Sequence, residues 1–423
     1  MFQNREIVTA IEFGSSKICV LVGESCENGT VKIIGRGEAR ADGMIKGEIA
    51  NMDTVFEQLG TALNDADAAS GGELNNTRIF VVPISGCGIS SYAGVGTVFI
   101  KNENKRVSSH DREEAHQNAL IHPLDPDRLV LNSAESYFVI DDQLHRRDPM
   151  GQTAYKLDAH VHIIHGLINR IENFRTVIRD SGYENNIDLV FSPLASGQGV
   201  LAEEERENGV MLIDFGAGVT DYHVEFNSGV LASGQIQVGF SHVLNDLAIG
   251  LELPLETCRK LIEDGTLSAA LAERRQYLNI PQPLNRVRRI PLDAFETIYQ
   301  LRLRELFSII REQAEAQTSL AKLNSGVVLT GGGALFEPVQ KILRDEMQMS
   351  VRVGSPINMV GAVTGLENPR YSCVWGALKI ADFYLRCDTA GSGGALNKLI
   401  SGVDGVMTRM KEALGDFRGS FRF

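Results

Sequence analysis

The sequence predicts an α/β protein made of two like halves that face each other across a ligand cleft. Each half opens with three strand-like segments and a helix, and the two sets lie about two hundred residues apart. In each set the first strand ends on a carboxylate and a glycine-containing turn, at Glu12 and at Asp214. A later strand ends in three glycines, at residues 331–333. Because all three strand ends can bring backbone amides close to a phosphorylated ligand, the order of motifs predicts one shared cleft.

The first half begins with a meander of strands and continues into a helix. The predicted strands are residues 6–14, 17–25 and 30–40. Asn28-Gly29 is typical of a hairpin turn between the last two strands. Apolar residues at helical spacing then predict a helix over residues 51–70, with Asn51 or Asp53 as the N-cap. A strand over residues 77–85 leads into a segment of mixed character that ends near residue 160.

The second half repeats this order after a helix at residues 168–183 and a strand and helix at 186–201. Its three strands are residues 208–216, 219–227 and 229–239, and a helix follows at residues 242–251. A long helix is expected from Asp293 to about Ala321, with an apolar face that includes Leu301 and Ile309. The glycine-rich strand at residues 325–334 and a helix at 338–347 complete this half.

Composition excludes several classes of protein. The formal net charge of −13 argues against nucleic acid as a partner, because a surface that follows phosphates needs a basic field. The six cysteines include no CxxC pair, so we expect reduced thiols and no metal site built from Cys or His. No apolar run reaches the roughly 18 residues of a membrane span, and we expect an intracellular protein without a signal peptide.

The two strand-end turns carry the chemistry. The stretch LIDFGAGVTD (212–221) stops an apolar strand at a carboxylate and then turns through small residues, and IEFGSSK (11–17) has the same order. Either stretch alone is also compatible with an ordinary β-hairpin. Together with TGGGA (330–334) they predict two acidic turns that hold phosphates and Mg²⁺ from opposite sides, with the third element beside the nucleoside.

These motifs resemble the superfamily of actin, the heat-shock chaperone ATPases and the sugar kinases, which has a ribonuclease H-like fold. Among its branches, the chain is most similar to the FtsA family of bacterial cell-division proteins over about residues 5–385. Four further stretches carry this narrower resemblance: ADGMIKGEIANMD (41–53), VPISGCGISS (82–91), LDAHVHIIHG (157–166) and FSPLASGQGVL (191–201).

The resemblance implies a division of the chain into actin-like domains and added parts. It places the first domain at residues 1–81 and 160–205 with 370–386 returning to it, an inserted FtsA-type subdomain at 82–159, the second domain at 206–250 and 322–369, a nucleotide-side or partner subdomain at 251–321, a flexible linker at 387–395, and an amphipathic membrane-targeting tail at 396–423.

The resemblance also implies ATP with Mg²⁺ as the cofactor and assigns residues to it. Phosphate and Mg²⁺ binding falls to Glu12, Gly14, Ser15, Ser16, Lys17, Asp214, Gly216, Ala217, Gly218, Thr220 and Asp221, with Mg²⁺ reached by Glu12 and Asp214. Adenosine binding falls to Glu256, Arg259, Lys260, Gly331, Gly332 and Gly333. For the first three of these, an ordinary solvated helix pair is an equally good interpretation.

Three positions depart from the family pattern. Glu12 stands where most relatives carry Asp, Ala217 replaces a glycine, and Ser192 stands where actin-like ATPases often carry a carboxylate that orients water. Gln198 is the remaining candidate for positioning water. We therefore expect nucleotide binding with slow or absent hydrolysis, so that no catalytic residue is assigned.

The tail beyond a glycine- and serine-rich stretch has one continuous apolar face. That face consists of Leu396, Leu399, Ile400, Val403, Val406, Met407, Met410, Leu414 and Phe417, with Phe421 and Phe423 at the end. Such a helix needs a membrane surface, a partner helix or the folded body to cover its apolar face, and the flexible linker favours the membrane.

The expected function is a structural one. The resemblance implies a protein that polymerises into protofilaments at the division septum and tethers FtsZ, the tubulin-like division protein, to the inner face of the cell membrane, together with other division proteins. The alternatives are a small-molecule kinase of the same superfamily and an actin-like scaffold of the pilus-assembly type.

Overall fold

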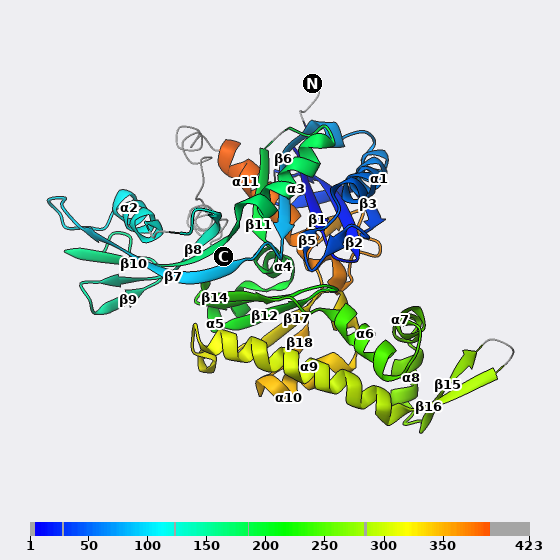
Figure 1. The fold of residues 1–423 in the computed structure, drawn as a ribbon. Helices are drawn as coiled ribbons and strands as arrows, with labels where there is room; N and C mark the ends of the chain where they lie inside the picture. The colour runs from blue at the N-terminus through cyan, green and yellow to red at the C-terminus, as the bar shows by residue number, and fades with distance from the viewer. Residues whose placement is uncertain (1–4, 28, 122–123, 185, 283–285, 390–423) are drawn as a thin grey trace.

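The computed structural model describes residues 5–27, 29–121, 124–184, 186–282 and 286–389, and its framework is two similar β-sheets. Figure 1 shows one sheet above the other, with a third, smaller sheet extending to one side. The strands are β1 (Ile7–Phe13), β2 (Lys17–Ser25), β3 (Val31–Arg40), β4 (Met44–Ile45), β5 (Glu48–Ile49), β6 (Thr77–Ile84), β7 (Ser90–Phe99), β8 (Arg128–Ile140), β9 (Leu144–Arg146), β10 (Lys156–Leu167), β11 (Asn186–Phe191), β12 (Val210–Phe215), β13 (Thr220–Phe226), β14 (Gly229–Ile236), β15 (Tyr277–Gln282), β16 (Arg286–Pro291), β17 (Val327–Thr330), β18 (Val351–Val353) and β19 (Val360–Gly361).

The α-helices cover these sheets and connect them. They are α1 (Met52–Ser70), α2 (Ser109–Leu120), α3 (Ile168–Asp180), α4 (Ser192–Val200), α5 (Glu203–Asn208), α6 (Phe240–Gly250), α7 (Leu255–Glu263), α8 (Thr266–Ala272), α9 (Leu292–Glu315), α10 (Pro338–Met347) and α11 (Ser372–Thr389). Asn51 caps α1 as predicted, because its side chain accepts a hydrogen bond from the amide of Thr54.

The two large sheets have the same strand order, which confirms the internal repeat. The first runs β11-β6-β1-β2-β3-β19, and the second runs β18-β17-β12-β13-β14. In both sheets the three meander strands pair antiparallel and the next two strands add in parallel. The predicted α/β class with duplicated halves is therefore correct, since equal patterns of strands produced equal sheets.

The third sheet belongs to the segment between β6 and α3. Its order is β7-β10-β8-β9, and α2 lies on one face of it. Gly94 and Gly96 on β7 make this packing possible, because a methyl group at either residue would collide with a carbonyl oxygen of α2. Figure 1 shows this inserted sheet projecting away from the two large ones.

Two details at helix ends differ from the sequence prediction. Helix α9 ends at Glu315 rather than near Ala321, and its residue Leu301 is 66% exposed instead of facing the core. Helix α11 continues to Thr389, so the first residues assigned to the linker are helical. The remaining linker and the whole amphipathic tail, residues 390–423, lie outside the described residues.

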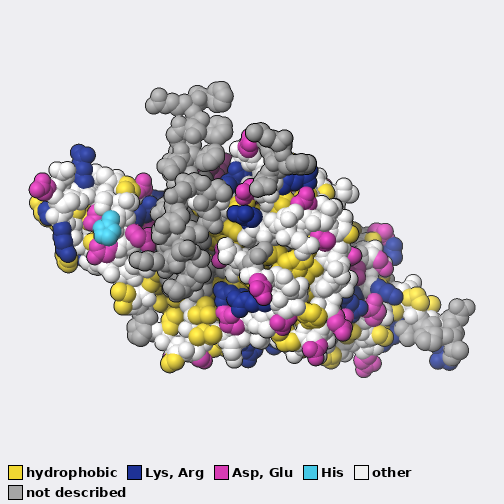
Figure 2. Space-filling view, turned by 90° about the horizontal axis from the view of Figure 1, so that it is seen from above, with side chains coloured by type: hydrophobic (Ala, Val, Ile, Leu, Met, Phe, Trp, Pro, Cys, Tyr) yellow, Lys and Arg dark blue, Asp and Glu magenta, His cyan; other side chains and the backbone are white. Residues whose placement is uncertain are grey.

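The surface of the described chain is mixed in charge. On the face seen in Figure 2, acidic and basic side chains are interspersed, and its described part carries no broad basic area. Among the helices of the described ranges, none combines the length and the hydrophobicity that a bilayer crossing requires.

Gly37 on β3 tests how tightly α1 packs on the first sheet. Its absent Cβ would overlap the carbonyl oxygen of Ala62 on α1. We expect Gly37→Ala to lower the stability by about 1–3 kcal/mol, the usual cost of overpacking a core. The measurement is the thermal unfolding midpoint.

Gly60, which lies on α1 itself, supplies the matched control. A methyl group there would meet no atom within 4 Å, so Gly60→Ala should raise the stability by about 0.5–1 kcal/mol through helix propensity. Equal behaviour of the two variants would contradict the packing argument.

Candidate functional site: two facing turns and a glycine strand end

The first turn joins β1 to β2. The amide of Gly14 donates to the carbonyl of Lys17 at 2.9 Å, and this hydrogen bond closes the turn. The Lys17 ammonium lies 2.7 Å from Oε2 of Glu12 and is buried. Burial alone would lower the pKa of Lys17, but the charge and the hydrogen bond of Glu12, with further contributions from Cys19 and Glu38, together outweigh burial and raise that pKa. Glu12 and Lys17 therefore form an internal ion pair, while Ser16 is exposed at the tip.

The second turn, between β12 and β13, has the same construction. The amide of Gly216 donates to the carbonyl of Val219 at 3.1 Å, as Gly14 does to Lys17. Asp214 lies directly opposite Asp221 in the strand pair, so both carboxylates project from one face. Next to them, Thr220 donates to the carbonyl of Val238 at 2.7 Å, which leaves its hydroxyl engaged away from the turn.

The two turns are in direct contact. A methyl group at Gly218 would collide with Oγ of Ser15, and it would lie 3.3 Å from Cα of Lys46. The Ser15 hydroxyl also accepts a hydrogen bond from the amide of Gly47 at 3.1 Å. The structure therefore brings the predicted phosphate turns together, with the β4–β5 hairpin beside them.

The third element is the end of β17, and it lies against the second turn. Gly331 has a φ of 85°, and a methyl group there would collide with Oδ1 of Asp214. Gly333 lies against the ring of Phe215 with no room for a side chain. At Gly332, by contrast, a methyl group could be accommodated, since it would lie 3.9 Å from Cβ of Arg370, an ordinary van der Waals contact.

Asp214 and Asp221 are carboxylates in a desolvated setting. Burial raises the pKa of Asp214 to about 6, although a hydrogen bond with Ser196 of α4 opposes the shift. Burial raises the pKa of Asp221 to about 8, and the charge of Asp214 adds to it. Oδ2 of Asp221 lies 2.5 Å from the hydroxyl of Ser85, but its Oδ1 is buried without a hydrogen-bond partner among the described residues.

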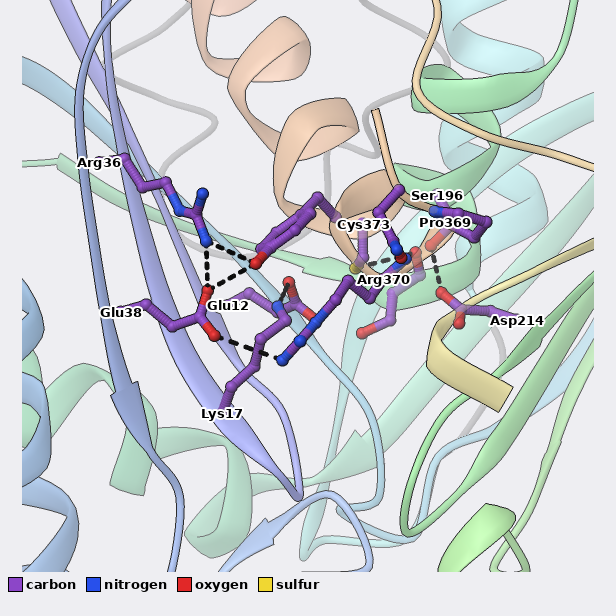
Figure 3. Close-up of polar contacts among 12 residues, drawn as sticks. Glu12, Lys17, Arg36, Glu38, Ser196, Asp214, Pro369, Arg370 and Cys373 are labelled. Atoms are coloured by element: carbon purple, nitrogen blue, oxygen red, sulfur yellow. Dashed lines mark hydrogen bonds and ion pairs between the residues drawn. The ribbon is translucent and has the colours of Figure 1, made fainter. Parts of the chain in front are cut away.

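A cluster that the sequence did not single out lies beside the first turn (Figure 3). Tyr371 donates to Glu38 at 2.9 Å, and Arg370 reaches the other oxygen of Glu38 at 3.3 Å. The Lys17 ammonium lies 5.1 Å from the centre of the Tyr371 ring, and the Arg36 guanidinium lies 4.6 Å from it. Although burial opposes the change, hydrogen bonds from Arg36 and Tyr371 lower the pKa of Glu38.

Helix α4 lies between the two halves and makes a side-chain hydrogen bond to the second turn through Ser196. Ser196 donates to Oδ2 of Asp214, as Figure 3 shows. Ser192 and Gln198, the two positions on this helix relevant to orienting water, contact other groups through their backbone carbonyls. The carbonyl of Ser192 lies 3.6 Å from Sγ of Cys373, and the carbonyl of Gln198 accepts from Lys379 at 2.7 Å.

The expected adenosine helix, α7, presents its charges to solvent. Arg259 pairs within the helix with Glu256 at 3.5 Å and with Glu263 at 4.0 Å. Lys260 is exposed, and α7 packs against α6 and α8. The contacts of these residues are those of a solvated helix, whereas Gly331–Gly333 lie beside Asp214, so the structure gives the two groups different surroundings.

No described group of three or more His, Cys, Asp or Glu side chains is arranged to hold a metal ion. Magnesium at nucleotide sites takes one or two carboxylates and completes its shell with phosphate oxygens and water. Asp214 and Asp221 fit such a partial donor set, since both are hard oxygen ligands on one face and Oδ1 of Asp221 is unsatisfied.

Comparisons with known proteins agree on one family. The family model "Cell division protein FtsA" matches residues 211–376, and "SHS2 domain inserted in FTSA" matches residues 86–165. Cell division protein FtsA of Neisseria meningitidis is 28% identical over 97% of this chain and 98% of its own length. The Escherichia coli K12 protein of the same name is 26% identical over 89% of this chain and 90% of its own.

Solved structures share the fold at low sequence identity. A PilM-PilN type IV pilus biogenesis complex has a TM-score of 0.59 at 14% identity, covering 88% of this chain and 97% of that one. MreB5 of Spiroplasma citri bound to ADP has a TM-score of 0.53 at 13% identity, covering 92% and 100%. These likenesses confirm the actin-like fold.

The raised pKa of Asp221 predicts that the stability of the folded protein depends on pH. In the unfolded chain an Asp has an ordinary pKa of 3.8, whereas the folded value is raised to about 8. The folded protein therefore binds the proton more tightly, and the stability that this binding supplies is lost as the pH rises from about 4 through 8.

The substitution Asp221→Asn removes the titrating group, so this loss of stability at rising pH should disappear. The amide oxygen of asparagine can still accept the hydrogen bond from Ser85. We expect the variant to gain stability over the parent by a few kcal/mol between pH 5 and pH 8.5, since one pKa unit is worth about 1.4 kcal/mol. Thermal unfolding of the ligand-free proteins across this range measures it. The exposed Asp65→Asn is the control, and a pH-independent difference for Asp221→Asn would refute the prediction.

Proposed function

Since this chain is a relative of the FtsA cell-division proteins along most of its length, we propose that it binds ATP and polymerises on the inner face of the cell membrane. There it tethers the FtsZ division ring to the membrane at the septum, as a peripheral protein with other division proteins as partners. Its role in cell division follows from the relationship, and the finer assignments rest on the geometry below.

One observation supports nucleotide binding above the others: two turns of equal construction meet from equivalent edges of two equivalent sheets. In each, a glycine amide donates to the carbonyl three residues on, at Gly14 and at Gly216. Such turns leave further amides available for phosphate oxygens. At the adjoining strand end, exposed Gly332 offers the nucleoside a position without a side chain, and Gly331 and Gly333 allow the backbone on either side of it to pack against Asp214 and Phe215.

Residue roles follow from the contacts. Lys17 supplies positive charge beside the first turn, and Ser15 and Ser16 supply hydroxyls. Bound Mg²⁺ would neutralise phosphate charge, and Asp214 and Asp221 are the carboxylates best placed to hold it. Glu12 is already paired with Lys17 at 2.7 Å, so it would contribute to the cation through water or after releasing the lysine. Glu256, Arg259 and Lys260 are proposed to contact the adenosine. Because they face solvent in this structure, such contacts would require α7 to move.

Hydrolysis is proposed to be weak or absent. The side chain that α4 offers to the second turn is the hydroxyl of Ser196, and it is already bonded to Asp214. A hydroxyl is a poor general base at neutral pH, and Ser192 offers no carboxylate in its place. Nucleotide would then act by selecting the conformation that polymerises.

A kinase of the same superfamily is the second candidate function. It would need an acceptor pocket with a free catalytic carboxylate at the cleft, whereas Asp214 and Asp221 are hydrogen-bonded to Ser196 and Ser85. Phosphoryl transfer to a panel of sugars would favour this candidate. A pilus-assembly scaffold would share the cleft and differ in its partner, and the likeness to PilM shows the fold alone.

Asp214→Asn tests the nucleotide site. The variant keeps the side-chain size but loses the charge that faces the cation. We expect affinity for ATP with Mg²⁺ to fall by about tenfold or more, equal to about 1.4 kcal/mol, and affinity in EDTA to change little. Fluorescence titration with a labelled ATP measures both, with Asp65→Asn as the control. Equal affinities in Mg²⁺ for variant and parent would rule out a role for Asp214.

Vesicle pelleting tests the tether. Full-length protein should pellet with anionic-lipid vesicles more strongly with ATP, because polymerisation multiplies weak tail contacts by avidity. Truncation of residues 395–423 should abolish pelleting, and Met407→Asp on the apolar stripe should reduce it about tenfold or more.

Asp404→Asn, on the polar face of the same predicted helix, is the matched control and should pellet normally. Electron microscopy of the pellets should show filaments. Undiminished pelleting of the truncated protein would contradict the tether.

A further inference from the structure

The inserted subdomain is connected through the chain to the first half of the molecule, but it packs against the second half. The chain enters it after β6, at Ser85 and Gly86, and leaves it through β10 into α3. In space, β7, β8 and β10 contact β14, the edge strand of the second sheet. Because the covalent connection and the resting surface belong to different halves, the subdomain spans the boundary between them.

Side chains of the subdomain satisfy the exposed edge of β14. Two of its backbone carbonyls accept hydrogen bonds, from Ser91 to Ser233 at 2.8 Å and from Ser136 to Val230 at 2.5 Å. The carbonyl of Ser228, just before the strand, accepts from Arg147 at 2.6 Å. His162 adds a hydrogen bond of 2.7 Å to the Ser233 hydroxyl. These hydrogen bonds cover part of an edge strand that would otherwise present unpaired carbonyls.

The end of this contact nearest the cleft reaches the second turn. The side-chain amide of Gln235 on β14 pairs with the backbone of Gly86 in both directions, at 2.8 Å to the amide and 2.9 Å to the carbonyl. The neighbouring Ser85 hydroxyl lies 2.5 Å from Oδ2 of Asp221. Asp221 is itself the cross-strand partner of both Asp214 and Gln235. Two consecutive residues at the subdomain's entry are thus bonded to the second sheet, Ser85 to the cleft carboxylate Asp221 on β13 and Gly86 to Gln235 beside it on β14.

The backbone atoms at this junction are so closely packed that no side chain fits at Gly86 or Gly47. A methyl group at Gly86 would lie 2.8 Å from the carbonyl oxygen of Lys46, and one at Gly47 would lie 3.0 Å from the amide of Gly86. Gly47 also binds the Ser15 hydroxyl of the first turn. A displacement of either phosphate turn must therefore move the entry of the subdomain or break these contacts.

We infer that the inserted subdomain responds to the occupant of the cleft through Ser85 and Gln235. The inference rests on the proposed nucleotide site and adds what that site controls: the attachment of the subdomain to β14. A ligand that fixes the two turns also fixes the junction, so the subdomain is held more firmly when the cleft is filled. Linkage requires the converse, since loosening the junction must weaken ligand binding by the same factor.

Amide hydrogen exchange of the full chain tests this inference. With saturating ATP and Mg²⁺, exchange in β7, at residues 90–99, should slow by about fivefold or more, although β7 carries no proposed ligand contact. In the double variant Ser85→Ala/Gln235→Ala, saturated with ATP, this slowing should vanish. Gln235→Ala alone should show an intermediate effect and serves if the double variant unfolds.

Ser136→Ala is the matched control. It removes another hydrogen bond between the subdomain and β14, at 2.5 Å to Val230 and away from the junction, and should retain the ATP-dependent slowing. Undiminished slowing in the Gln235→Ala and double variants would overturn the inference. Its absence from the parent protein with ATP demonstrably bound would do the same while leaving the proposed function intact. Failure of ATP to bind the parent at all would overturn both.

Discussion

The two halves of the molecule meet at a point where no side chain can be accommodated. Gly218 of the second turn touches Ser15 of the first, and Gly331 touches Asp214 from the adjoining strand end. The absence of a side chain at Gly218 is what lets turns from two separate sheets approach each other this closely. The equal order of the two sheets delivers the turns to this point, so the repeat is the structural basis of the candidate site.

The same approach buries charge, and the surrounding residues limit its cost. Glu12 is paired with Lys17, whereas Asp214 and Asp221 accept hydrogen bonds from the hydroxyls of Ser196 and Ser85 and form no ion pair with a described residue. A hydroxyl satisfies one carboxylate oxygen but brings no opposite charge, so burial raises both pKa values. This difference between the turns supports the proposal that Mg²⁺ binds at the second turn. The first turn already contains a positive charge, the ammonium group of Lys17.

The hydroxyls also tie distant parts of the chain to the turns. Ser196 brings in α4, and Ser85 brings in the entry of the inserted subdomain, whose sheet rests on β14. Beside the first turn, Arg370 and Tyr371 at the start of the returning segment hold Glu38. Segments from several separate parts of the chain therefore meet at the site, which is the arrangement expected where a local event is to have distant effects.

The sequence by itself determined the repeat, the two turns and a cap at either Asn51 or Asp53, because each depends on local backbone geometry: strand periodicity, glycine at tight turns, and a side chain that reaches an amide three residues on. The structure selects Asn51 as the cap. Only the tertiary structure decided that Glu12 pairs with Lys17, that Ser196 and Ser85 are the partners of the buried carboxylates, and that Leu301 faces outward from α9. Serine has no periodicity that marks a distant partner, and helical spacing shows that a face is apolar without showing how much of it is covered. These choices depend on which surfaces the folded halves bring into contact, a long-range property that no short stretch of sequence contains.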